Sequence, residues 1–244
     1  MMLTGTPQQP DGLLLVDKPA NCTSHDVVDY VRRRFKFKKV GHCGTLDPMA
    51  TGLLMLVLGR ATKVQDLLMS EDKEYAGTLK LGAATSTQDA EGEVTETRPV
   101  PPLTEQALRA AFDKFKGDFY QTPPMVSALK KDGVPLYKLA RQGKVVEREP
   151  RLVHVYSYQL TNIAPPAVDF VIRCSKGFYV RTYCHDLGQE LGCGGHLAAL
   201  RRTRSGNFTL EHAVTRAELE ATVSAADLLP RILGLTDISR IRRQ

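Results

Sequence analysis

The sequence predicts an α+β fold in which helices flank a mixed, largely antiparallel β-sheet. Two observations favour this class. Hydrophobic residues make up 42% of the 244 residues and charged residues 25%, proportions typical of a folded chain with a sizeable core. Apolar segments of strand length and helix-like segments follow one another without the regular strand–helix–strand order that a doubly wound parallel sheet requires.

The elements of the first half follow from the spacing of apolar residues and from the residues that stop each segment. We predict a flexible polar leader over residues 1–11, a buried strand at 13–16 stopped by Pro19, a helix beginning at Ser24, a turn-rich loop at 41–52, a buried strand at 53–58, a helix near 60–70, a strand at 75–81, a loop at 82–92 and a helix from Thr104 to about Phe115.

In the second half, proline, glycine and charged residues crowd the stretch 121–150, which predicts an irregular insertion with a short helix at 136–141. Strands at 151–162 and 168–175, a helix from Tyr179 to Leu191 and a short strand near 197–201 follow. Thr215 and Glu218 are spaced as a capping box. The predicted organisation is one domain over 12–210 and a short helical, basic tail over 211–244.

The sequence indicates in which cellular compartment the protein is found. The longest apolar run, 53–58, is far shorter than the roughly 18 residues that a membrane span needs, and the N-terminus lacks the features of a secretory signal. The five cysteines are odd in number and include no CxxC pair, which disfavours a disulfide scaffold. We therefore predict a cytoplasmic protein. The formal net charge of +6 indicates a polyanionic partner only weakly.

A dense run of cations follows the helix predicted at Ser24. Six lie between Arg32 and Lys39, three of them arginines and three lysines. Two interpretations stay open with equal weight. Cations near a helix C-terminus are favoured by the helix dipole, and a cluster this dense also suits a surface that faces phosphates.

Two segments are candidates for a functional site. Asp47 stands before Pro48 in a stretch that also holds Gly41, Gly44 and Gly52, so its carboxylate could project from a constrained loop into a cleft. Composition alone favours an ordinary Asp-Pro turn. The segment 175–182 gathers two cations and two aromatic residues, a mixture that suits phosphate contacts and base stacking, although the residues alone favour an ordinary helix start with a surface arginine.

Several motifs, taken in order, resemble those of TruB-type tRNA pseudouridine-55 synthases. They are Asp17-Lys-Pro19 with Thr23-Ser24, Val40-Gly-His-Cys-Gly-Thr-Leu-Asp-Pro-Met-Ala-Thr-Gly-Leu-Leu54, Lys73-Glu-Tyr75, Ser127-Ala-Leu-Lys130, Leu136-Tyr-Lys-Leu-Ala-Arg141, Lys176-Gly-Phe-Tyr-Val-Arg181, Asp186-Leu-Gly188 and Leu191-Gly-Cys-Gly-Gly-His196. The resemblance covers about residues 12–210, which it identifies as a catalytic domain of the pseudouridine-synthase fold with an RNA-gripping insertion at about 121–150.

The resemblance implies an isomerase that converts uridine 55 in the T-loop of tRNA to pseudouridine without a cofactor or a metal. It breaks the N1–C1′ glycosidic bond, turns the base and joins C5 to C1′. Asp47 matches the nucleophile, and an aspartate is ionised at neutral pH without an activating base. Arg181 matches the partner of that aspartate, and Tyr75 matches the residue that stacks on the base and assists proton removal from C5. Attack at C1′ or at C6 stays open.

The resemblance also assigns residues around these three. His42, Tyr75, Tyr179 and Leu200 match positions that bind the target uridine. Asp89, Lys176 and Lys18 match supporting positions, Asp89 as a candidate to orient Arg181 and Lys18 as part of a motif that supports the active-site loop. The insertion cations that would meet the RNA backbone include Lys130, Lys131, Arg141 and Arg148, together with Lys138, Lys144 and Arg151.

The partner implied is tRNA, at its T-loop and T-stem, with no membrane and no obligatory protein partner, and the enzyme is expected to be a monomer. The tail after Leu210 is too short for the RNA-binding PUA-type domain that ends many bacterial members. Three other readings are an RNA-guided, dyskerin-like synthase subunit, a non-catalytic RNA-binding module, and a metal-dependent hydrolase. The last would use Cys184, His185, Asp186, Cys193 and His196, whose spacing matches no recognised zinc pattern.

Overall fold

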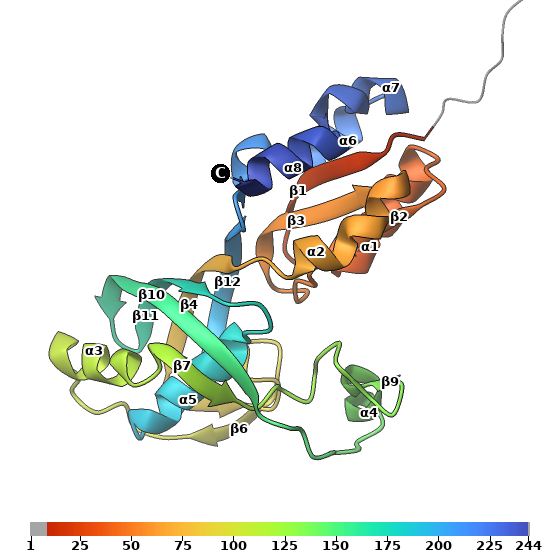
Figure 1. Cartoon of the computed structure of the whole chain (residues 1–244). Helices are drawn as coiled ribbons and strands as arrows, with labels where there is room; N and C mark the ends of the chain where they lie inside the picture. The colour runs from red at the N-terminus through yellow and green to blue at the C-terminus, as the bar shows by residue number, and fades with distance from the viewer. Residues whose placement is uncertain (1–8, 244) are drawn as a thin grey trace, which may run out of the picture. The chain divides into compact units, whose positions relative to one another are not determined.

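Figure 1 shows the computed structural model, which describes residues 9–243. The chain divides into two units. Unit 1 combines the N-terminal part through Lys73 with the part from Arg201 onward, and unit 2 is Glu74–Leu200. The chain thus leaves unit 1 near the start of one strand and returns to it within another, so unit 1 is assembled from both ends of the sequence.

Unit 1 is built on β1 and β3, which pair antiparallel from Gly12↔Leu58 to Lys18↔Gly52. Strand β2 pairs antiparallel with β3, and the end of β12 pairs parallel with it. The elements are β1 (Gly12–Lys18), α1 (Ser24–Arg34), β2 (Val40–Cys43), β3 (Thr51–Leu58), η1 (Gly59–Val64), α2 (Gln65–Met69), β13 (Phe208–Thr209), η2 (Leu210–His212), β14 (Val214–Thr215), α6 (Arg216–Ala221), α7 (Ala225–Leu228), η3 (Leu229–Arg231), β15 (Ile232–Leu233) and α8 (Leu235–Arg243).

The apolar run at 53–58 explains the position of β3. All six of its side chains are fully buried, as are Leu13 and Leu14 of β1. A strand that is covered on both faces has no need of an alternating pattern, so its sequence reads as a continuous apolar stretch. The core of unit 1 therefore forms around this pair of strands, where it also takes in Phe208 and Ile238 from the C-terminal part.

Helix α1 begins where the sequence predicted. Thr23 is its N-cap and forms a capping box with Asp26, which satisfies two backbone donors that the first turn leaves free. Val27, Val28 and Val31 are buried on one side of the helix. The helix is thus fixed at its start by capping and along its length by an apolar face.

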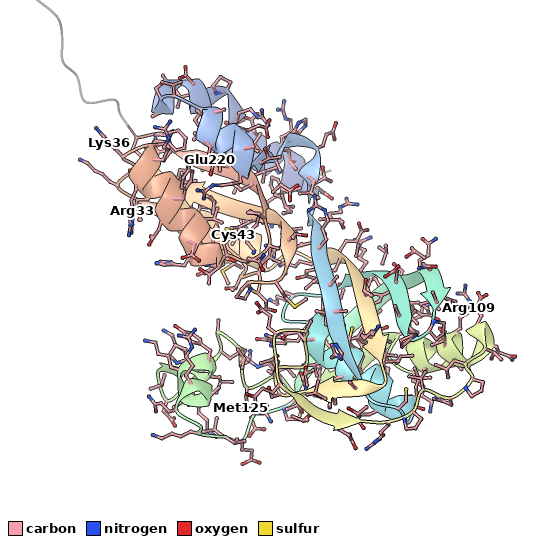
Figure 2. All side chains as sticks on the ribbon, turned by 180° about the vertical axis from the view of Figure 1, so that it is seen from behind. Arg33, Lys36, Cys43, Arg109, Met125 and Glu220 are labelled. Carbon is pink, nitrogen blue, oxygen red and sulfur yellow. The ribbon has the colours of Figure 1, made fainter. Side chains whose placement is uncertain are left out.

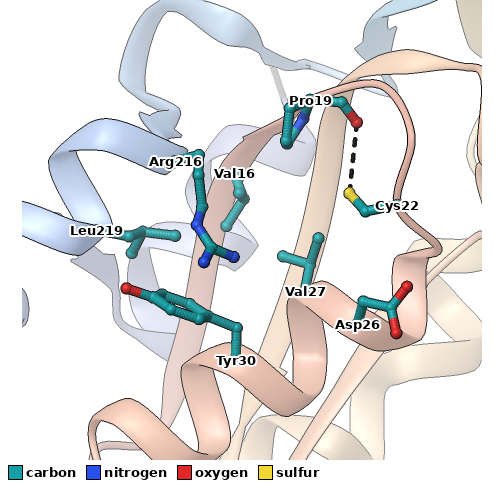
Figure 3. A pocket seen from close by; sticks show the side chains of 8 residues that line it. All are labelled: Val16, Pro19, Cys22, Asp26, Val27, Tyr30, Arg216 and Leu219. Atoms are coloured by element: carbon teal, nitrogen blue, oxygen red, sulfur yellow. Dashed lines mark hydrogen bonds between the residues drawn. The ribbon is translucent and has the colours of Figure 1, made fainter.

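The tail at 211–243 is helical and packs against α1 and β1. Figure 3 shows the residues that line a small cavity where α6 meets them. The cavity measures about 30 Å³ and has room for water molecules only. There the Arg216 guanidinium stacks on the Tyr30 ring, 3.6 Å from its centre. At the other end of the tail, Arg242 donates to Glu71 at 2.5 Å. The tail is therefore an integral part of unit 1.

Unit 2 contains a sheet with the strand order β12-β4-β11-β10-β7, in which β10 pairs antiparallel with both β11 and β7. Its elements are β4 (Lys73–Leu81), β5 (Ala83–Thr85), β6 (Val94–Thr97), α3 (Glu105–Asp113), β7 (Gly117–Gln121), β8 (Lys130–Lys131), β9 (Val134–Pro135), α4 (Leu136–Arg141), β10 (Arg151–Ala164), β11 (Ala167–Cys174), α5 (Val180–Glu190) and β12 (Gly195–Ser205). Phe112 of α3 packs edge-on against Phe170 and Tyr183, with ring centres 5.8 and 5.7 Å away.

The predicted fold class, a mixed and mostly antiparallel sheet with helices, is confirmed, and α4 occupies the predicted range. Several details differ. The loop predicted from residue 41 begins with strand β2, the loop at 82–92 contains β5, the helix near 60–70 is a 3₁₀ helix followed by the short α2, and strands β6 and β7 were missed. These strands are short or polar and exist through pairing with distant partners, which local patterns do not report. Within 9–243, no helix is long and apolar enough to cross a membrane.

Candidate active site

Asp47 lies in the loop at 44–50 that joins β2 to β3 in unit 1. The loop closes on a turn in which the Ala50 amide donates to the Asp47 carbonyl at 3.1 Å. Both ends of the loop have positive φ, +86° at Gly44 and +99° at Gly52, a conformation that glycine adopts without steric cost. The turn that composition alone favoured at Asp47 is therefore present, and Asp47 itself is half-buried.

Gly52 is required for a second reason. A β-carbon there would lie 2.2 Å from the Arg202 carbonyl oxygen and 2.8 Å from its amide nitrogen. Strand β12 approaches this closely because Arg202 pairs parallel with Gly52. Glycine thus lets β12 run directly against the end of the Asp47 loop.

Three side chains that are almost fully buried hold this loop. Ser24 Oγ accepts from the Leu46 amide at 2.8 Å and donates to the Leu46 carbonyl at 3.1 Å. Lys18 Nζ donates to the Pro48 carbonyl at 3.2 Å, and also to the carbonyls of Pro19 and Cys22. The residues on either side of Asp47 are therefore both fixed, and the supporting place predicted for Lys18 has a physical basis.

Arg202 is the third of these side chains and is only 1% exposed. Its Nε donates to the Leu53 carbonyl at 2.7 Å, and its Nη2 donates to the Gly44 carbonyl at 3.1 Å. One guanidinium thus bridges the two ends of the loop. Sequence reasoning missed both Arg202 and Ser24, because a buried arginine in a strand and a serine at a helix start have no local signal.

His42 of β2 lies beside this loop. Burial lowers the pKa of its imidazole and the nearby positive charge of Arg202 lowers it further, against a smaller opposing effect of a hydrogen bond with the Gly44 backbone. Its Nδ1 is buried and has no hydrogen-bond partner among the described residues. A neutral imidazole with an unpaired nitrogen can bind a polar atom of a ligand, which suits the substrate-binding place predicted for His42.

Arg181 is the centre of the polar site in unit 2. It is 3% exposed, as is Asp89, and its Nε lies 3.5 Å from the Asp89 carboxylate. Its Nη1 donates to the Thr87 carbonyl at 3.0 Å and its Nη2 to the Val126 carbonyl at 2.7 Å. The guanidinium is therefore fixed by the loop after β5 and by the start of the insertion, in a geometry that lets Asp89 orient it.

Unit 2 also contains the candidate residues predicted to bind or support the substrate. Tyr179 precedes α5, and its amide and carbonyl bond the side chain of Gln121 at 2.8 and 3.1 Å. Tyr75 and Leu200, 9% and 8% exposed, belong to β4 and β12, which are neighbouring strands. Lys176 is exposed, so it is free to contact a large ligand.

The insertion exposes its cations. Lys130, Lys131 and Arg141 are exposed and Arg148 is half-buried. A groove of about 180 Å³ is lined by Lys130, Lys131, Arg148 and Arg151, with Glu147 and Glu149. Lys131 Nζ donates to the Glu147 carbonyl at 2.9 Å, and Arg141 stacks on Tyr137 at 5.6 Å. Exposed cations on short elements are the arrangement expected of phosphate contacts.

Three of the residues that a metal-dependent hydrolase would use are buried or bonded to the backbone. Burial raises the pKa of the Cys184 thiol well above its usual value, and Cys193 is also buried. His196 Nδ1 lies 2.8 Å from the Ala83 carbonyl. In the range 9–243, no three His, Cys, Asp or Glu side chains are grouped so that they could hold a metal ion.

This fold is shared with chains of solved complexes that contain Cbf5. A Cbf5–Nop10–Gar1 complex contains a chain that is 30% identical, with a TM-score of 0.67, over 84% of this chain and 52% of that one. In the archaeal box H/ACA Nop10–Cbf5 complex the values are 29% and 0.65, over 95% and 58%. The present chain thus spans about half the length of these solved chains. Fold and site together define a pseudouridine synthase.

The family model described as TruB family pseudouridylate synthase (N terminal domain) matches residues 32–180, and the model for the tRNA pseudouridylate synthase B C-terminal domain matches 181–234. The tRNA pseudouridine synthase B of Opitutus terrae is 60% identical over 86% of this chain and 88% of its own length. That of Syntrophotalea carbinolica is 51% identical, over 86% and 69%. The chain belongs to the TruB family of pseudouridylate synthases, and it is an isomerase.

Proposed function

We propose that this protein converts uridine 55 in the T-loop of tRNA to pseudouridine. Support comes from the similarity to relatives that carry the name tRNA pseudouridine synthase B. The single observation that carries the proposal is the Asp47 loop, in which Ser24, Lys18 and Arg202 fix the backbone on both sides of one carboxylate. Binding alone needs no carboxylate held in this way, whereas a nucleophile does.

Asp47 acts in this proposal as the group that assists cleavage of the N1–C1′ bond. An ordinary aspartate, with a pKa of about 3.9, is already ionised at neutral pH and needs no base to activate it. The chemistry resembles that of retaining glycosidases, where a carboxylate takes the place of the departing ring substituent. The freed uracil then turns so that its C5 attacks C1′, and the Asp47 carboxylate leaves C1′ as this bond forms. The proton on C5 is lost to solvent and N1 gains one, so atoms balance and nothing is consumed.

Tyr75 and Arg181 are the other two catalytic residues in this proposal. Tyr75 stacks on the target base and assists removal of the C5 proton. Arg181 serves in this proposal as the partner of the catalytic carboxylate, because a guanidinium opposes the effect of desolvation on the charge of a carboxylate. Asp89 is a positioning residue that acts through Arg181, to which it lies 3.5 Å away.

Recognition of the substrate requires the uridine to leave its stack, since its reacting atoms are inaccessible inside a folded T-loop. His42, Tyr179 and Leu200 bind the extruded nucleotide in this proposal, and Lys176 supports them. The cations of the insertion, Lys130, Lys131, Arg141 and Arg148, bind the RNA backbone. Such contacts position the substrate without reading its sequence.

The test measures tritium release from unmodified tRNA that carries [5-³H]uridine, with a chelator present. Light scattering on the same sample checks that the protein is a monomer. The wild type should release one tritium per tRNA, and tRNA with cytidine in place of uridine 55 should release none. Release that persists from the cytidine-containing tRNA would overturn the assignment of the target.

An RNA-guided activity is the second candidate, and the structural likeness to Cbf5 favours it. Sequence identity favours the stand-alone enzyme instead. The relatives named tRNA pseudouridine synthase B are 51–60% identical, whereas the Cbf5 chains are about 30% identical. Conversion of tRNA by the purified protein, without guide RNA or partner proteins, distinguishes the two. A requirement for a guide would replace the proposed function with the guided one.

A further inference from the structure

The run of cations after α1 forms a surface that the proposed catalytic site does not use. We call residues 32–39 the basic segment. Its six cations, Arg32, Arg33, Arg34, Lys36, Lys38 and Lys39, are all exposed. Figure 2 shows Arg33 and Lys36 projecting outward from the same end of α1. The sequence left two explanations open, compensation of the helix dipole and contact with phosphates.

The contacts at the end of the helix distinguish the two explanations. Arg32 pairs with Asp29 at 2.8 Å, Arg33 lies 3.7 Å from the same carboxylate, and Arg34 donates to the Thr222 carbonyl at 2.8 Å. The arginines are thus accounted for by local partners and by the dipole, which acts only within the last turn.

The three lysines follow the helix, which ends at Arg34. In the part of the chain that the structure describes, no ion pair involves Lys36, Lys38 or Lys39. Dipole compensation therefore leaves their charges unexplained. Three uncompensated cations within four residues create a positive potential that favours a polyanion.

The backbone beneath the lysines is fixed. Phe35 and Phe37 are both 5% exposed and pack on each other with ring centres 5.8 Å apart. The Gln9 side chain accepts from the amides of Lys38 and Lys39 at 2.8 and 3.0 Å and donates to the Lys39 carbonyl. Buried phenylalanines thus alternate with outward lysines on an anchored segment, so a ligand would bind a surface that is already ordered.

The conformation of Lys36 is a second, independent observation. Its φ is +57°, in the left-handed region where a helix commonly ends on glycine. The Phe37 amide closes this end by donating to the Arg32 carbonyl at 3.0 Å. A lysine here adds a charge at a position where the backbone alone favours glycine.

Unit 1 also fixes the separation between the basic segment and Asp47. Helix α1 begins at Ser24, which is bonded to Leu46 in the Asp47 loop, and ends at Arg34 beside the lysines. Its 11 residues correspond to about 16 Å at roughly 1.5 Å per residue. Strand β2 runs back from Val40 to the loop. This length corresponds to a few base pairs of a duplex stem, on the order of five.

We propose that Lys36, Lys38 and Lys39 bind the phosphate backbone of the tRNA stem, about five nucleotides from the uridine that reacts at Asp47. The inference rests on the proposed function and adds a second RNA contact in unit 1. The lysines read no sequence, since phosphate contacts set register and orientation only. They strengthen the binding of RNA that carries a long stem and leave the chemical step unchanged.

The test compares the triple variant Lys36→Gln/Lys38→Gln/Lys39→Gln with Lys80→Gln/Lys114→Gln/Lys116→Gln. The control removes the same charge from exposed lysines of unit 2. Affinity for unmodified tRNA is measured between 50 and 200 mM salt, together with the single-turnover rate at saturating RNA. Loss of three phosphate contacts should weaken binding by about 10- to 100-fold and reduce the salt slope by about 2 to 3. The rate should stay unchanged.

A T-loop hairpin with a two-base-pair stem is the matched RNA control, because it is too short to reach the basic segment. The triple variant should bind this hairpin as the wild type does. The proposal is overturned if the triple variant keeps the affinity and salt slope of the control variant, or if it loses as much affinity for the short hairpin as for tRNA. Failure of the wild type to convert tRNA would instead overturn the proposed function, so the two failures are distinguishable.

Discussion

The Asp47 loop and the insertion at 122–150 use positive charge in opposite ways. The loop is held by Lys18 and Arg202, which are 0% and 1% exposed and donate to its carbonyl oxygens. The insertion displays Lys130, Lys131 and Arg141 on its surface. Both regions contain little regular structure. A buried cation can fix a backbone that has no secondary structure of its own, whereas an exposed cation stays free to bind a ligand.

The difference has an energetic basis. A buried cation is costly unless its donors are satisfied, and each donor that it loses also leaves an orphaned carbonyl. Substitution of a buried cation should therefore affect stability and catalysis. Substitution of an exposed one should affect only the binding of RNA. The variants below test this difference between buried and exposed cations.

Arg181→Met should have the largest effect on stability. It removes the guanidinium that joins the start of the insertion, at Val126, to the loop after β5, and it leaves the buried Asp89 without its cationic partner. Breaking a buried pair in this way costs about 3–5 kcal/mol. The measurement is the free energy of unfolding in urea. The double variant Arg181→Met/Asp89→Asn should recover part of the loss, and the absence of any recovery would show that the pair is not coupled.

Arg202→Met should lower stability by about 2–4 kcal/mol, because the carbonyls of Gly44 and Leu53 lose their charged donor. It should also slow single-turnover conversion by roughly 10- to 100-fold with little change in tRNA affinity, since the Asp47 loop loses its bridge. Arg204→Met is the matched control, because Arg204 donates to Gly206 and Asn207 rather than to the loop. Equal effects on rate would contradict a positioning role for Arg202.

Asp186 shows how burial of a carboxyl group affects stability when no opposite charge compensates for it. Burial raises the pKa of its carboxyl group from 3.8 to about 6. Between these values the folded state binds more protons than the unfolded state, so stability falls as pH rises from about 4 to 6 and then levels off. Asp186→Asn should therefore stabilise the protein at pH 7.5 by about 1–2 kcal/mol, less than the full shift implies because the group is partly exposed.

The gain from Asp186→Asn should vanish near pH 4, where both states hold a protonated carboxyl group. Urea denaturation across pH 4–8 measures it, with the exposed Asp132→Asn as control. A stabilisation that is constant over this range would show that the carboxyl group is not responsible.

The insertion cations should give the smallest effects on stability. Lys130→Gln should change the free energy of unfolding by less than about 0.5 kcal/mol, as is usual for exposed sites. It should weaken tRNA binding by only a few-fold and lower the salt slope by about 0.7–0.9. The single-turnover rate should not change. A loss of rate at saturating RNA would place Lys130 in the catalytic machinery and break the contrast between the two regions.

The sequence predicted the parts of the fold that have local causes. The capping residue Thr23 precedes the predicted start of α1, and α4 follows from its own short pattern at 136–141. Strand β2 was missed because it exists only through pairing with β3. Predictions for the site divide in the same way. Asp47 and Lys18 came from motifs, whereas Arg202 supports the loop from more than 150 positions away in the chain, a relation visible only in the folded structure.

In the proposed function, Asp47 performs the chemistry and the loop around it holds its carboxylate in position. The most direct test is single-turnover tritium release by Asp47→Asn at saturating unmodified tRNA, with the dissociation constant measured in parallel. Asparagine keeps the size of the side chain and removes the charge and the nucleophile. The account predicts a fall in rate of at least about 10⁴-fold with an affinity within threefold of the wild type. A variant that binds tRNA and still converts it at a tenth of the wild-type rate or faster would contradict the account.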